Sequence, residues 1–176
     1  MKKICLFIAM SLDGYLADSK GSVAWLDGQG DDDDNIDAYS AFVKDIDTVI
    51  MGWNTYHQIV TELSPNEWIY GDFTTYVVTH REKPSFDKIH FTNESPIELV
   101  KKLREGSGKH IWICGGANLI QQLVRENLID YYDITVVPTI LGSGIRLFEN
   151  AGHEIKLRLL KVQTYHGMTD LVYTRR

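Results

Sequence analysis

Short apolar runs that end in glycine or polar residues leave few folds open to this chain. Residues 3–10 (KICLFIAM) and 110–114 (HIWIC) are continuous apolar runs, which are typical of strands buried on both faces. Shorter runs of the same kind are found at 47–51, 74–79 and 88–92. Helical spacing lies between these runs, and such alternation predicts an α/β fold with three α/β/α layers around a mostly parallel sheet.

The remaining elements complete this alternation. Ser95 as N-cap, Pro96 in the first turn and Glu98 in a capping box mark the clearest helix, at 96–105. Residues 155–165 and 168–175 alternate as a hairpin that adds an antiparallel edge at the C-terminal end of the sheet. Further helices are expected at 37–45, 55–63 and 118–127, and a strand at 131–140.

Length and charge narrow the class of protein. A chain of 176 residues favours a single domain over residues 1–176. The net charge is −6 and no basic block is present, which disfavours a nucleic-acid partner. The first apolar run is too short for a signal peptide or a membrane span, so the cytoplasm is the expected location. Cys5 and Cys114 lie in predicted buried strands and make no disulfide framework.

Two of the predicted strands lead directly into helices through glycine. After Gly52, a helix beginning near Thr55 offers free N–H groups that suit a phosphate, although an ordinary capped turn has the same pattern. Gly115 and Gly116 would let a ligand approach the backbone closely, and close packing of a helix on the sheet is the alternative. There is no GxGxxG dinucleotide fingerprint.

A third predicted strand ends at Thr79-His80-Arg81. The Arg81 guanidinium can bind two phosphate oxygens, although a surface arginine after a strand is also common. Because the carboxyl ends of parallel strands share one edge, all three segments would together hold an extended nucleotide.

The sequence gives less support to a metal-dependent enzyme or to an enzyme with a nucleophilic serine. The Asp31–Asp34 run suits a hard cation only if a shaped loop brings the carboxylates together, and a solvated acidic loop is the simpler interpretation. The histidines form no HExxH motif and no GxSxG nucleophile elbow is present. We therefore expect no metal site.

At these segments the sequence resembles the dihydrofolate reductase superfamily, in its riboflavin-pathway deaminase-reductase branch. Residues 11–17 (SLDGYLA) are similar to the AxSxDGxIA opening of that branch, and 49–56 (VIMGWNTY) to its VxMGRxTY segment. Residues 78–81 (VTHR) resemble the strand end on the adenosine side of the cofactor, and 113–117 (ICGGA) the IxGG segment over the pyrophosphate. Residues 137–148 resemble the closing P-x-x-L-G-x-G-x-x-L-F pattern.

The resemblance implies a homodimeric reductase that transfers hydride from NADPH to a carbon of a C=N or C=O bond in a small heterocyclic substrate. It also implies a cis peptide bond between Gly115 and Gly116. Implied cofactor contacts are Ala9, Leu16, Ala17, Gly52, Trp53, Thr55, Thr79, His80, Arg81, Gly115, Gly116, Ala117, Asn118 and Leu119. The expected substrate pocket is walled by Ala9, the loop 18–30 with Trp25, Phe42 and Thr135.

Two departures from the family pattern bear on cofactor and substrate. Trp53 stands where the family has an arginine for the 2′-phosphate, which leaves NADH possible beside NADPH, with Arg81 as the remaining phosphate partner. The helix carboxylate that grips the pterin in folate reductases is replaced by Ala38, with Asp37 beside it. Asp13 and Asp37 are therefore the candidate catalytic acids, and Asp13 can equally cap a turn.

The sequence thus predicts a riboflavin-type reductase acting on a pyrimidine-like or pterin-like ring or its sugar imine. A folate reductase, a nucleotide-binding module without turnover, and a metal-dependent hydrolase that uses the Asp31–Asp34 run are the alternatives.

Overall fold

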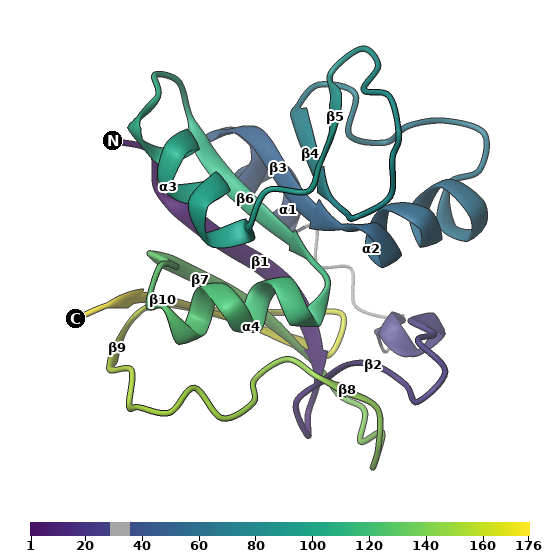
Figure 1. Cartoon of the computed structure of the whole chain (residues 1–176). Coiled ribbons are helices and arrows are strands. Elements are labelled where there is room, and N and C mark those ends of the chain that lie inside the picture. The colour runs from purple at the N-terminus through teal and green to yellow at the C-terminus, as the bar shows by residue number, and fades with distance from the viewer. Residues whose placement is uncertain (29–35) are drawn as a thin grey trace.

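The computed structural model describes residues 1–28 and 36–176, and its centre is one eight-stranded sheet with the order β5-β4-β3-β6-β1-β7-β10-β9 (Figure 1). Six strands are parallel: β1 (Ile4–Ser11), β3 (Ile46–Gly52), β4 (Thr74–Val78), β5 (Ile89–Thr92), β6 (His110–Gly115) and β7 (Tyr131–Val137). The hairpin of β9 (Leu157–Tyr165) and β10 (Met168–Arg175) adds an antiparallel edge beside β7. The predicted sheet and its antiparallel edge are confirmed.

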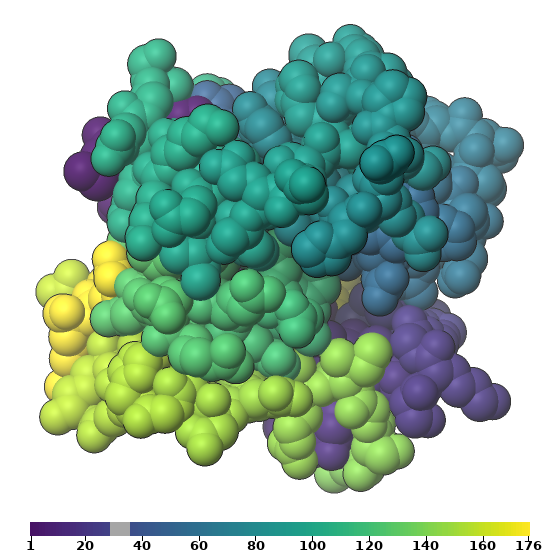
Figure 2. Space-filling view, viewed as in Figure 1, coloured from purple at the N-terminus to yellow at the C-terminus, as the bar shows by residue number. Residues whose placement is uncertain are grey.

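Helices cover both faces of the sheet because its central strands are apolar on both sides. On one face α3 (Pro96–Glu105) and α4 (Ala117–Arg125) bury Leu99 and Leu123 against Ile50 and Ile113. Figure 2 shows that the segment from β8 to β9 runs across this face beside α4. This core removes apolar side chains from water, which stabilises the packing of both helices on the sheet.

On the other face lie α1 (Ala38–Val43) and α2 (Trp53–Gln58), which continues as a π-helical turn over Ile59–Leu63. Phe42 of α1 stacks on Phe7 of β1, with 4.4 Å between the ring centroids. The Trp112 ring packs edge-on against both. The expected three-layer α/β/α arrangement is therefore present.

Several boundaries differ from the sequence prediction. The strand expected at 131–140 ends at Val137, because Pro138 has no N–H to donate and the Thr139 N–H turns back to the Val137 carbonyl at 2.7 Å. The helix expected at 55–63 starts at Trp53, and the helix expected at 37–45 is the shorter α1. The predicted capping box is wrong: Ser95 Oγ accepts from the Ile97 N–H, but Glu98 pairs with Lys101 instead.

Three elements have no counterpart in the sequence prediction. The short strand β2 (Tyr15–Ala17) pairs with β8 (Ile145–Arg146), which follows the glycine turn at 142–144. A single 3₁₀ turn, η1 (Ala24–Leu26), lies in the loop after β2. Elements of two or three residues are too short for apolar periodicity to show in the sequence.

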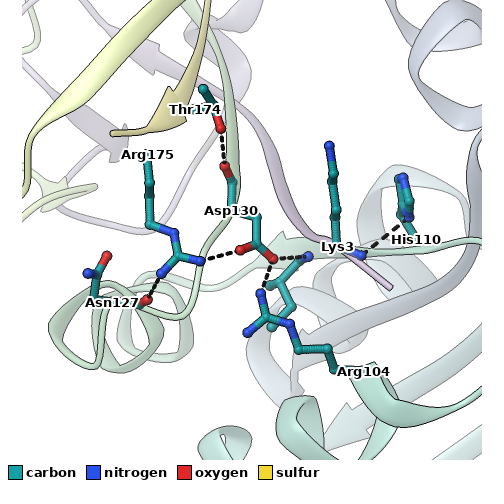
Figure 3. A network of polar contacts seen from close by, with 8 residues as sticks. Lys3, Arg104, His110, Asn127, Asp130, Thr174 and Arg175 are labelled. Atoms are coloured by element: carbon teal, nitrogen blue, oxygen red, sulfur yellow. Dashed lines mark hydrogen bonds and ion pairs between the residues drawn. The ribbon is translucent and has the colours of Figure 1, made fainter. Parts of the chain in front are cut away.

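Asp130 joins the amino-terminal ends of β1 and β7 to the carboxyl end of β10 (Figure 3). Its carboxylate accepts from the Ile4 N–H at 2.9 Å and pairs with the guanidinium groups of Arg104 and Arg175. The Asp130 carbonyl accepts from Thr174 Oγ1 at 3.1 Å. This network joins β1, α3, the start of β7 and β10, at the sheet edge opposite to the strand ends that the sequence singles out.

Candidate functional site

The carboxyl ends of β4, β3 and β6 lie side by side, because these three strands are parallel neighbours in the sheet. A Cβ atom placed on Gly52 would lie 3.7 Å from the Gly116 nitrogen. A Cβ on Gly115 or Gly116 would lie 3.3 Å from Thr55 Oγ1. The two glycine turns predicted from the sequence are therefore in contact, with Thr55 between them.

The turn between β6 and α4 leaves backbone groups open to a ligand. The Gly115–Gly116 peptide bond is cis, as the family resemblance implies, and Gly115 has a φ of 144°. Gly116 is the N-cap of α4 and no side chain caps the helix, so the N–H groups of its first turn keep their capacity for an anion. That first turn contains Ala117, Asn118 and Leu119. These features fit the pyrophosphate of a dinucleotide.

Two cations stack on the indole ring of Trp53. The Arg81 guanidinium carbon lies 4.9 Å from the ring centroid, and Lys83 Nζ lies 5.0 Å from it. Thr79 is buried and accepts from the Arg81 N–H at 3.1 Å, while the His80 side chain is exposed. Trp53 thus occupies the position of the family's arginine and gathers positive charge there through cation–π contacts.

Lys83 is a candidate site residue that the sequence reasoning missed. It follows Arg81 by two positions in an exposed segment without regular structure. The available signal was a second basic residue so close to the strand end, next to Pro84.

The predicted nicotinamide contacts lie on β1 and β2. Ala9 is near the carboxyl end of β1, and Leu16 and Ala17 belong to β2. The turn at 142–144 packs closely on β2, since a Cβ on Gly144 would lie 2.2 Å from the Ala17 carbonyl oxygen. Gly144, with a φ of 147°, thereby holds β8 against β2.

Asp13 joins the turn after β1 to this glycine turn. Its carboxylate accepts from Ser11 Oγ at 2.7 Å, from the Gly142 N–H at 2.8 Å and from the Leu141 N–H at 3.1 Å. These bonds, the one from Ser11 first, lower the pKa of Asp13 to about 2. Asp13 is therefore an ionised hydrogen-bond acceptor that fixes two loops, and its catalytic role stays a prediction.

Asp37 is the N-cap of α1. Its carboxylate accepts from the Ser40 N–H at 2.9 Å, and the Ser40 side chain together with this N–H holds the pKa of Asp37 below the usual range. Ala38 is half-buried on the side of Phe42, whereas Asp37 is exposed. A catalytic role for Asp37 also stays a prediction, and its present contacts are those of a helix cap.

The loop after β2 connects two distant parts of the site. Gln58 Nε2 of α2 donates to the Gly21 carbonyl at 3.1 Å, and Trp25 Nε1 donates to the Ser22 carbonyl at 3.2 Å. At its other end, Gly28 contacts the β9–β10 turn at His166. The Asp31–Asp34 run lies outside the described residues. Within 1–28 and 36–176, no three His, Cys, Asp or Glu side chains are grouped to hold a metal ion.

Thr135, a predicted substrate contact, lies beside Ala9 in the sheet and belongs to a buried polar group. Thr135 Oγ1 donates to Asp170 Oδ1 at 2.6 Å, and Gln163 Nε2 donates to Asp170 Oδ2 at 2.8 Å. Asp170 is fully buried. The sequence reasoning missed Asp170, although an acid inside the apolar alternation of 168–175 was a visible signal.

Asp133 lies two residues before Thr135 on the same face of β7. Burial and, after it, the nearby Asp170 raise its pKa to about 6, against the opposing effect of Lys161. Within the described part of the chain, the buried Asp133 Oδ1 has no hydrogen-bond partner. The sheet thus carries two carboxyl groups next to the predicted substrate pocket, where α1 offers none.

A comparison with known protein families identifies the family to which this fold belongs. The RibD C-terminal domain profile matches residues 2–171. The chain belongs to the RibD C-terminal domain family. The predicted riboflavin-pathway branch of the dihydrofolate reductase superfamily is thereby confirmed.

Two known proteins match this chain along its whole length. The uncharacterized protein YwjB of Bacillus subtilis (strain 168) is 39% identical, over 99% of this chain and 98% of its own length. The crystal structure of a putative riboflavin biosynthesis protein from Shewanella sp. PV-4 has a TM-score of 0.85 and 28% identity, and covers 100% of this chain and 99% of that one.

A second solved structure supports the RibD fold alone. The Thermotoga maritima diaminohydroxyphosphoribosylaminopyrimidine deaminase/5-amino-6-(5-phosphoribosylamino)uracil reductase has a TM-score of 0.70 and 14% identity. The match covers 99% of this chain and 57% of that protein. In the described residues, no helix is both long and apolar enough to cross a membrane.

Proposed function

We propose that this RibD-type protein is an NADPH-dependent reductase of a small nitrogen heterocycle. The observation that carries the proposal is the meeting of the β3, β4 and β6 ends around the Gly115–Gly116 turn. This turn has no side chain on its surface and leads into the uncapped start of α4. Family membership as a RibD reductase domain supports the same chemistry.

The residues present fit a dinucleotide phosphate. The turn at Gly116 and the first turn of α4 would hold the pyrophosphate, and Thr55 lies beside them. Arg81 and Lys83, stacked on Trp53, would hold the 2′-phosphate that distinguishes NADPH from NADH. When bound, the nicotinamide supplies hydride to the substrate, and this chain orients the two reactants and excludes water between them.

The proposed substrate is a pyrimidine with a phosphoribosyl-type side chain. The Thermotoga relative is named for reduction of 5-amino-6-(5-phosphoribosylamino)uracil, and we propose the same compound class for this chain. A carbonyl or imine carbon of the side chain would accept hydride, while the ring would lie on the face of β1 and β7, near Ala9, Thr135 and Phe42.

Steady-state NADPH oxidation with 5-amino-6-(5-phosphoribosylamino)uracil tests the proposal. We expect turnover with NADPH, weaker turnover with NADH, and loss of both in the absence of the pyrimidine. If calorimetry shows NADPH binding but no pyrimidine or pterin supports oxidation, the protein is a nucleotide-binding module instead. If NADPH does not bind, the cofactor assignment is wrong.

We also propose a homodimer in a reducing cytoplasm. The edge strand β9 leaves Leu159 and Val162 about half exposed, at 51% and 50%, an apolar surface that suits burial against a second copy. Cys5 and Cys114 are both free thiols, which supports a reducing compartment. Light scattering on wild type and on Val162→Lys would test the dimer, since the variant should shift the mass toward the monomer.

A further inference from the structure

Four residues form a row across the carboxyl half of the sheet. Ala9 of β1 pairs with Thr135 of β7, Thr135 pairs with Asp170 of β10, and Asp170 pairs with Gln163 of β9. Directly paired residues point to the same face of a sheet. Phe7, two residues before Ala9, stacks on Phe42, so this row faces the side of α1. The row therefore begins at the predicted nicotinamide contact and runs along the expected substrate wall.

Asp170 is an unusual residue for this place in the row. It is 0% exposed, and its carboxylate accepts from Thr135 Oγ1 at 2.6 Å, Tyr165 Oη at 3.0 Å and Gln163 Nε2 at 2.8 Å. All three donors are neutral, and in the described chain no lysine or arginine forms an ion pair with it. A buried carboxylate without a cation is unfavourable compared with an apolar side chain.

The bond to Asp170 decides what Thr135 can offer a ligand. A threonine hydroxyl has one proton to donate and two lone pairs that accept. Because Asp170 takes the proton, Thr135 Oγ1 is left with acceptor capacity alone. Thr135 is 7% exposed and lies between Asp170 and Ala9 in the sheet, on the face where the substrate pocket is predicted.

We propose that Asp170 is a positioning residue that fixes Thr135 as a hydrogen-bond acceptor for an N–H group of a pyrimidine-like ring. This inference rests on the proposed reductase function and names how its substrate is recognised. In folate reductases, the resemblance implies a carboxylate on the helix for this work. Here α1 has Ala38 at that place, and the strand pair of β7 and β10 supplies the acceptor.

This arrangement selects rings by their donors. A diaminouracil ring has ring N–H groups and exocyclic amino groups, any of which can donate to Thr135. A ring without a donor at this position would leave a buried acceptor unpaired, and sites built around a hydrogen bond reject such analogues strongly. Asp170→Asn keeps the shape but adds an N–H₂ donor, so Thr135 can accept from it and turn its own proton toward the pocket.

Calorimetry with 5,6-diaminouracil, without NADPH, provides a readout that is independent of turnover. We expect Asp170→Asn and Thr135→Val each to weaken binding about tenfold, as the loss of one hydrogen bond to the ring would do. The double variant should bind no worse than either single variant, because both changes remove the same contact. Thr135→Ser keeps the hydroxyl and should bind within about twofold of wild type.

Tyr165→Phe is the matched control. It removes the other donor to the same Asp170 oxygen and keeps the bond from Thr135 Oγ1 to Asp170, so binding should stay within about twofold. Steady-state turnover provides a second test. In Asp170→Asn the KM for 5-amino-6-(5-phosphoribosylamino)uracil should rise, while the KM for NADPH should stay the same. If Asp170→Asn does not fold, the contrast between Thr135→Val and Thr135→Ser still decides whether the hydroxyl is needed.

Three results would overturn the inference: additive losses in the double variant, an equal loss in Tyr165→Phe, or no binding of 5,6-diaminouracil by wild type. The first two would mean that Asp170 only holds the β9–β10 hairpin. Failure of the reductase proposal has a different signature. In that case wild type binds the ring and shows the Thr135–Asp170 coupling, yet oxidises no NADPH.

Discussion

The guanidinium of Arg81 lies over the indole ring of Trp53, with its central carbon 4.9 Å from the ring centroid. Lys83 Nζ is 5.0 Å from the same centroid, so two cations from the loop after β4 share one aromatic ring at the start of α2. Trp53 thus gathers two cations at the position where the family pattern has an arginine.

Cofactor preference follows from this cluster. Arg81→Ala should weaken NADPH binding by roughly 1.5 kcal/mol, near the lower end for a charge-assisted hydrogen bond because Lys83 remains. NADH has no 2′-phosphate, so its affinity should change little. Calorimetry with both cofactors measures the difference, and Arg81→Ala/Lys83→Ala should lose more NADPH affinity than either single variant. Equal losses for NADPH and NADH would show that Arg81 does not contact the 2′-phosphate.

The glycine turn at the end of β6 should tolerate no side chain when cofactor is bound. A Cβ on Gly116 already lies 3.3 Å from Thr55 Oγ1, and a branched side chain would fill the proposed pyrophosphate position. Gly116→Val should weaken NADPH about tenfold or more, roughly 1.4 kcal/mol. Gly71→Ala, in the loop before β4, is a control that should leave affinity unchanged. Wild-type affinity in folded Gly116→Val would place the cofactor elsewhere.

Asp130 should matter for stability and not for the cofactor. Its carboxylate holds Arg104, Arg175 and the Ile4 N–H, and its side chain is 14% exposed. Asp130→Asn would leave two guanidinium groups without their partner, and should lower the free energy of unfolding by roughly 2–4 kcal/mol. Urea denaturation measures this, with Glu98→Gln in an exposed ion pair as a control expected to cost under about 0.5 kcal/mol. The NADPH Kd should be unchanged.

The sequence predicted those parts of the candidate site whose residues lie close together in one short segment of the chain. The turns at Gly52 and Gly116 and the strand end at Arg81 follow apolar runs directly, so parallel pairing alone brings them to one edge. The bond between Thr135 and Asp170 depends on the register of an antiparallel hairpin, which local patterns do not fix. The same holds for Asp13, whose partners at 141–142 lie far along the chain.

Dihydrofolate should be a poor substrate. The Asp37 carboxylate caps α1 through the Ser40 N–H at 2.9 Å, and Ala38 stands where the pterin-binding acid of folate reductases is expected. Asp37→Asn should change stability by only a few tenths of a kcal/mol, since asparagine is an equally good N-cap. Any residual dihydrofolate turnover should survive this change. A high wild-type turnover of dihydrofolate that collapses in folded Asp37→Asn would identify a folate reductase.

The last prediction concerns Asp133 and the dependence of stability on pH. Burial, followed by the neighbouring Asp170, raises the pKa of Asp133 from 3.8 to about 6 in the folded protein. Below pH 4 the carboxyl is protonated in both the folded and the unfolded state, so it carries no penalty. As the pH rises from 4 to 6, the unfolded chain is already ionised whereas the folded chain must ionise a buried group, so stability is lost over this range.

Asp133→Asn removes this penalty. Urea denaturation at several pH values should therefore show that the free energy of unfolding of the variant rises relative to that of wild type between pH 4 and 6. The expected rise is about 1 kcal/mol, because partial exposure of Asp133 reduces the penalty. Above pH 6 the difference should stay constant. In Asp170→Asn the like-charged neighbour is gone, so the pKa of Asp133 should fall and the transition should move to lower pH. A stability difference that does not change between pH 4 and 7 would mean that Asp133 ionises as it does in the unfolded chain.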